Sequence, residues 1–121
     1  MCMDLFNVQK LLQARVLTGS ELMHRQIESC CGSDMMSDVL AYVKNQAVLL
    51  TGLVNTQVVR TASMMDMSCI VFVRSKAPGD DILALAREYG IAVLGTDLRM
   101  YDACGILYSN GLGANPTQCH E

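Results

Sequence analysis

Residues 48–73, VLLTGLVNTQVVRTASMMDMSCIVFV, hold two continuous apolar runs separated by an amphipathic segment. Val48–Leu50 and Cys69–Val73 contain no charged residue, which is typical of strands covered on both faces in a parallel sheet. The segment between them repeats apolar residues at the spacing of one helix face: Val58, Val59, Ala62 and Met65. The stretch therefore predicts a strand, a helix and a second strand parallel to the first.

The same alternation continues on both sides of this stretch. Residues 91–94 form a third apolar run of strand length. Further helical stripes have apolar residues at i, i+3, i+4 and i+7, and they are Met36/Val39/Leu40/Val43, Ile82/Leu85/Ala86/Tyr89 and Met100/Ala103/Cys104/Leu107. Residues 34–110 are therefore expected to fold as an α/β domain of βα repeats with a mainly parallel central sheet.

The two ends of the chain differ from this pattern. Residues 5–12 suggest a short amphipathic helix, and residues 14–19 and 26–30 are predicted to be two further strands. Residues 113–121 are mostly polar and are expected to form a flexible tail. The organisation predicted is one domain over residues 1–112 followed by that tail.

Composition excludes several classes of protein. Of 121 residues, 51% are hydrophobic and 17% charged, so enough apolar surface can be buried to exclude a disordered chain. The net charge of −3 and scattered basic residues argue against nucleic acid as a partner. The sequence shows no membrane span and no secretory signal, so a cytoplasmic location is expected. The high apolar content predicts a homodimer, and either Met64 or Met65 must point outward as a candidate contact.

A ligand site is expected where the three predicted parallel strands end. Ligands of open α/β sheets bind outside the carboxyl ends of the strands, where loops open helices and offer free backbone N–H groups. Hydroxyls and cations in these loops suit a small anion, and the candidate residues are Thr51, Gly52, Asn55, Thr56, Arg60, Arg74, Ser75, Lys76, Thr96 and Asp97. The alternative is that the glycines form tight turns and the polar side chains cap helices.

No catalytic constellation or cofactor motif stands out. The sequence lacks a phosphate-binding Walker loop and a C-x-x-C pair, and neither His24 nor His120 is an obvious general base, so no cofactor or metal is expected. An alternative is a small enzyme acting on a phosphorylated or acyl substrate with Thr51, Asn55 and Arg60. Another alternative is a thiol- or metal-linked accessory protein using Cys30 and Cys31, which otherwise read as a strand end.

Two cysteines elsewhere are interpreted as structural. Cys69 begins an apolar run and Cys104 lies on a helical stripe. Buried free cysteines behave as small hydrophobic residues, so both thiols are expected to be buried and inert.

The order and content of five segments resemble the DRTGG domain family. These segments are residues 34–41, 49–62, 70–78, 86–91 and 100–108. The resemblance runs from about Val8 to Leu112. After Leu50-Thr51-Gly52, the chain reads Leu53-Val54-Asn55-Thr56 in place of the signature that gives the family its name.

The resemblance implies an α/β regulatory or dimerising module without catalytic residues of its own. Family members accompany phosphotransacetylases and CBS-containing pyrophosphatases, and they are similar to the N-terminal domain of HPr kinase/phosphorylase. Short free-standing members occur beside genes for iron-only hydrogenases and histidine-kinase-like ATPases, so the thiol- or metal-linked alternative is an accessory protein of an iron–sulfur, hydrogenase-type system. The partners implied are a second copy of the chain, a small anionic ligand of phosphate or nucleotide type, and a larger enzyme or signalling protein.

Overall fold

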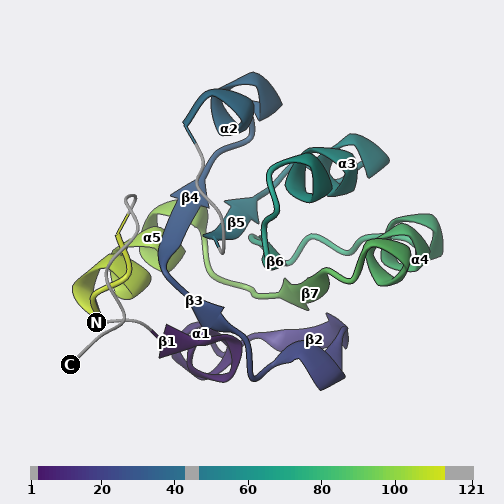
Figure 1. Ribbon diagram of the computed structural model, residues 1–121. Helices are drawn as coiled ribbons and strands as arrows, with labels where there is room; N and C mark the ends of the chain where they lie inside the picture. Colours follow the sequence, from purple (N-terminus) through teal and green to yellow (C-terminus); the bar gives the residue numbers. More distant parts are fainter. Residues whose placement is uncertain (1–2, 43–46, 114–121) are drawn as a thin grey trace.

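In the computed structural model, which describes residues 3–42 and 47–113, a five-stranded sheet lies between two layers of helices (Figure 1). Across the sheet the strands lie in the order β2 (Arg15–Thr18), β7 (Ala92–Gly95), β6 (Cys69–Phe72), β5 (Ala47–Thr51) and β4 (Ser29–Gly32). Residues 114–121, most of the predicted tail, lie outside the described residues, as does Val43 of the first helical stripe.

The three predicted central strands are confirmed as parallel neighbours. Leu49 of β5 pairs with Ile70 of β6, and Ile70 pairs with Val93 of β7. Every residue of these strands is buried, and successive side chains enter opposite faces of the sheet. A strand with two buried faces needs an uninterrupted apolar run, which explains the sequence pattern.

Each face of the sheet has its own hydrophobic core, and each is covered by its own layer of helices (Figure 1). One core packs α1 (Leu5–Leu12) and α5 (Met100–Ser109) against the sheet through Leu5, Val8, Leu12, Ala103 and Leu107. The other packs α2 (Met36–Tyr42), α3 (Thr56–Met64) and α4 (Asp80–Tyr89) through Val39, Val58, Val59, Ala62, Ile82 and Ala86. The helices therefore bury their apolar stripes as predicted, with exceptions at Leu40 (41% exposed) and Tyr89 (43% exposed).

The N-terminal third departs from the prediction in two ways. The predicted strand at residues 26–30 is two strands, since β3 (Gln26–Ile27) ends before Glu28 and β4 begins after it. β3 pairs antiparallel with β1 (Met3–Asp4), a strand that the sequence pattern did not reveal, whereas β4 is a parallel edge strand beside β5. The predicted strand at 14–19 is confirmed as β2, and it runs antiparallel to β7.

This topology sets four parallel strand ends along one edge of the sheet. The strand-end edge, as we call it, consists of the loops at residues 33–35, 52–55, 73–79 and 96–99 that follow β4, β5, β6 and β7.

Candidate functional site

A carboxylate that the sequence analysis did not select links the loops that follow β4, β5 and β6 at the strand-end edge. Asp34 follows β4, and its Oδ1 accepts hydrogen bonds from the Gly52 backbone N–H at 2.7 Å and the Thr51 hydroxyl at 3.0 Å. Its Oδ2 lies 3.7 Å from Arg74 Nη2. The Gly52 N–H, then the Thr51 hydroxyl and the Arg74 charge, hold the pKa of Asp34 below its usual range.

Gly52 and Arg74 are matched by shape as well as by their shared partner. A Cβ built on Gly52 would overlap the guanidinium of Arg74, so the absence of a side chain at residue 52 lets this group approach the backbone. Arg74 and Ser75 both have left-handed φ angles, of 60° and 59°. Their N–H groups donate to the carbonyls of residues 98 and 96, at 2.7 and 3.0 Å, which ties the β6–α4 loop to the β7–α5 loop.

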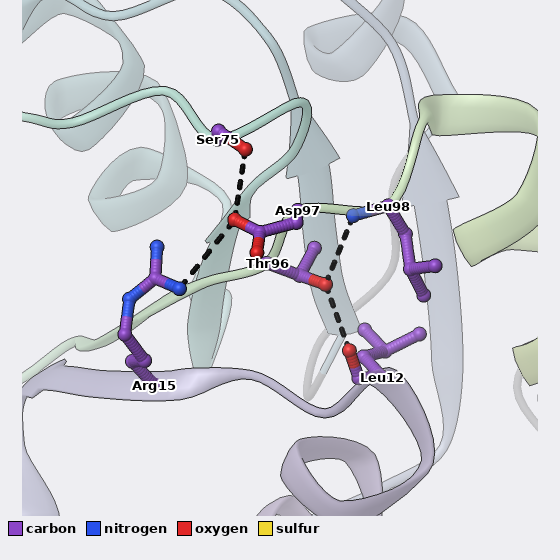
Figure 2. A network of polar contacts seen from close by, with 6 residues as sticks. All are labelled: Leu12, Arg15, Ser75, Thr96, Asp97 and Leu98. Carbon is purple, nitrogen blue, oxygen red and sulfur yellow. Dashed lines mark hydrogen bonds and ion pairs between the residues drawn. The ribbon is translucent and has the colours of Figure 1, made fainter.

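A second carboxylate joins these two loops to the edge strand β2 (Figure 2). The Ser75 hydroxyl donates to Asp97 Oδ1 at 2.8 Å, and Arg15 Nη1 lies 3.5 Å from the same oxygen. These contacts, with the Ser75 hydroxyl first, lower the pKa of Asp97. Arg15 was not predicted, because only the antiparallel pairing of β2 with β7 places it beside this loop.

Thr96 has a structural place beneath this network. Its buried hydroxyl donates to the Leu12 carbonyl at 2.7 Å and accepts from the Leu98 N–H at 3.3 Å (Figure 2). The hydroxyl therefore links the end of α1 to the end of β7 and shapes the loop that carries Asp97.

The remaining candidates have local or solvent-facing roles. Asn55 caps α3, with its Oδ1 accepting from the Val58 N–H at 3.1 Å. Arg60 Nη1 donates to the Thr56 hydroxyl at 3.1 Å along the exposed side of α3. Lys76 is exposed in the β6–α4 loop.

The structure thus separates the ten predicted residues into three groups. Thr51, Gly52 and Arg74 meet around Asp34, and Ser75 and Asp97 meet beside Arg15. The others lie apart from both contacts or support the loops, namely Asn55, Thr56, Arg60, Lys76 and Thr96. The signal for Asp34 is an acidic residue between a strand and a helix, and such a residue is equally suited to cap the helix.

Burial raises the pKa of the four cysteine thiols in the described residues. Cys30 and Cys31 are consecutive residues of β4, facing opposite cores, and burial followed by the neighbouring Cys104 raises the pKa of both thiols. Burial likewise raises the pKa of Cys69, which is fully enclosed as predicted. Cys104 differs from the prediction because it is only partly buried, with its Sγ close to Gly32 of the edge strand β4.

The hollows found in the described residues do not include Asp34, Thr51, Gly52 or Arg74. One, of about 820 Å³, runs along α5 and is lined by residues that include Tyr101, Gly105 and Tyr108. The other, of about 360 Å³, lies near the amino ends of the strands beside Arg25 and Asp66. Within residues 3–42 and 47–113, His, Cys, Asp and Glu form no group of three that would suit a metal ion.

No helix in the described part of the chain is both long and apolar enough to cross a membrane.

Comparison with known proteins agrees with this fold. The model of the DRTGG domain family matches residues 7–109. No curated protein sequence matches the chain. The fold is similar to that of the CBS and DRTGG domains of the regulatory region of Clostridium perfringens pyrophosphatase, a crystal structure complexed with the activator diadenosine tetraphosphate. The TM-score is 0.69 at 15% identity, over 86% of this chain and 45% of that one, so the chain spans less than half of its neighbour's length.

Proposed function

Because this chain belongs to the DRTGG domain family, we propose that it is a non-catalytic regulatory module that binds a small anionic ligand. The ligand class is a phosphate or a nucleotide, and the proposed site is the strand-end edge. The main contacts would come from Thr51, Gly52 and Arg74, with Ser75 and Lys76 in the adjoining loop. Asn55 and Thr96 would hold the surrounding loops in place.

The observation that carries this proposal is the environment of the Asp34 carboxylate. A backbone N–H and a hydroxyl donate to one of its oxygens, and a guanidinium lies beside the other. The same three kinds of donor bind phosphate oxygens in proteins, and arginine is especially suited to do so. The edge is thus already built to hold anionic oxygen, although the anion it holds is the chain's own.

The structural neighbour supports the ligand class. That pyrophosphatase region was crystallised with a dinucleotide activator, diadenosine tetraphosphate, whose phosphates carry the negative charge. A nucleotide is therefore a suitable probe for this chain. The chain covers only 45% of the neighbour's chain. The proposed position of the ligand therefore rests on the contacts of this chain described above, and not on the position of the neighbour's ligand.

Calorimetric titration with ATP and with inorganic pyrophosphate tests the proposal. We expect saturable binding to the wild-type protein and a loss of about ten-fold or more in affinity for Arg74→Gln, because a charge-assisted hydrogen bond is lost. Arg87→Gln is the matched control, since Arg87 lies near the far end of α4 and should leave binding unchanged. Equal affinity of both variants, or no binding by the wild-type protein, would contradict the proposed site.

We also infer that the module forms a homodimer through the outer face of α5. Tyr101 and Tyr108 are 88% and 74% exposed, and they flank Gly105 along the hollow on this helix. A second copy using the same face would satisfy the two-fold symmetry of most homodimers. Met64, the outward-facing methionine at 71% exposure, stands on α3 on the other side of the sheet.

Sedimentation velocity at micromolar concentration tests the dimer. The wild-type protein should sediment as a dimer and Tyr108→Lys as a monomer. Met64→Lys places the same charge on α3 and should leave the dimer intact. A monomeric wild-type protein would refute the dimer, and dissociation only by Met64→Lys would refute the proposed face.

A further inference from the structure

Asp34 connects the proposed ligand site directly to helix α2. It lies between the end of β4 at residue 32 and the start of α2 at Met36. The Ser33 N–H donates to the Leu50 carbonyl at 3.0 Å, so the chain is held to β5 just before Asp34. The side chain that contacts Gly52 therefore belongs to the short segment that leads from β4 into α2.

Helix α2 is weakly attached to the rest of the domain. Among its side chains described at residues 36–41, Val39 is the one that is buried. Met35, just before the helix, is 61% exposed and Leu40 is 41% exposed. The start of α2 is held by Ser33, whose hydroxyl accepts from the Met35 N–H at 3.0 Å, together with the three polar contacts of the adjacent Asp34.

The contacts of Asp34 are also weak enough to be exchanged. The side chains of Asp34 and Arg74 are 50% and 48% exposed, and exposed ion pairs contribute little because water screens them. A phosphate group carries more charge and more acceptor oxygens than a carboxylate. It therefore competes well for the Gly52 N–H and the Arg74 guanidinium.

We propose that Asp34 is a built-in competitor for the ligand, and that a bound phosphate group takes the place of its carboxylate on Gly52 and Arg74 and releases the start of α2. This mechanism rests on the proposed function, since it assumes an anion at the strand-end edge. It supplies what a regulatory module needs, because ligand binding then changes the position of a surface helix.

Asp34→Asn and Asp38→Asn test this competition. Each removes one negative charge near the start of α2, but Asp38 is an exposed residue of the helix and has no contact with Gly52 or Arg74. In calorimetric titrations with inorganic pyrophosphate, Asp34→Asn should bind about two- to five-fold more tightly than the wild-type protein, the range expected when an exposed ion pair is lost. Asp38→Asn should bind with the wild-type affinity.

Amide hydrogen exchange of residues 36–42 gives a second, independent readout. Saturating pyrophosphate should speed exchange in α2 of the wild-type protein and leave exchange in β6 unchanged. In Asp34→Asn, exchange in α2 should already be fast without pyrophosphate. The same measurement on Asp38→Asn should follow the wild-type protein.

The possible failures are distinguishable. If pyrophosphate binds the wild-type protein and Asp34→Asn equally tightly, or if α2 exchange does not respond, the competitor role is wrong while the ligand site stands. If pyrophosphate and ATP bind none of the three proteins, the ligand site fails and the competitor role fails with it.

Discussion

The buried hydroxyl of Thr96 allows the structural and ligand-binding roles of the strand-end edge to be separated. Thr96→Val keeps the shape of the side chain and removes only its hydrogen-bonding oxygen. The Leu12 carbonyl then loses its donor at 2.7 Å and the Leu98 N–H loses its acceptor at 3.3 Å.

The expected cost follows from these two contacts. Leaving a buried acceptor without its partner costs about 1–3 kcal/mol, and Thr96 is only 1% exposed, so water cannot easily replace the hydroxyl. The weaker bond from Leu98 adds little because that N–H is nearer the surface. We therefore expect the free energy of unfolding to fall by about 2 kcal/mol.

Urea unfolding monitored by circular dichroism measures this change. Thr61→Val is the matched control, since Thr61 is equally buried but its hydroxyl only accepts a 3.4 Å bond from Gln57 one helical turn away. It should cost less than about 0.5 kcal/mol, as expected for the loss of one long, local hydrogen bond. If Thr96→Val is as stable as Thr61→Val yet loses pyrophosphate binding, the structural role argued for Thr96 is wrong and the residue belongs to the ligand site.

Three further predictions follow from the described contacts. The pKa of Asp34 is lowered in the folded protein, so its contribution to stability is present above the ordinary carboxyl pKa and is lost as the pH falls through the folded value. In urea unfolding, the stability difference between the wild-type protein and Asp34→Asn should therefore shrink between pH 6 and pH 3. A constant difference would contradict the contacts described for Asp34. Gly19→Ala should lower the free energy of unfolding by about 2 kcal/mol, because φ is 89° and a Cβ would lie 2.7 Å from the Ala92 Cα. Thermal unfolding measures this change, and a variant as stable as the wild-type protein would refute it. Iodoacetamide should label Cys104 before Cys30 and Cys69 in the folded protein, because burial raises the pKa of all three thiols but Cys104 alone among them lines an open surface. Peptide mass spectrometry measures the order of labelling. Early labelling of Cys69 would contradict its place in the enclosed core.

The site shows the limit of prediction from residue types. Thr51, Gly52 and Arg74 were identified by their place after parallel strands, and the structure does bring them together. Asp34 was missed because an acidic residue before a helix is equally suited to cap it. The Asp34 carboxylate accepts from the Gly52 N–H, and not from an N–H of its own helix, because β4 and β5 are adjacent strands. That adjacency cannot be predicted from the residues near Asp34.

The sequence by itself determined the central part of this protein. A strand buried on both faces needs a continuous apolar run, and a helix covering it needs apolar residues on one face. Both patterns can therefore be recognised in the local sequence of residues 48–94. The tertiary structure alone decided the direction of β2, the division of residues 26–32 between two sheets, and the pairing of Asp34 and Asp97 with donors far along the chain. The partners of short edge strands and charged side chains depend on the packed structure, because the geometry of the packed strands sets which groups lie within hydrogen-bonding distance.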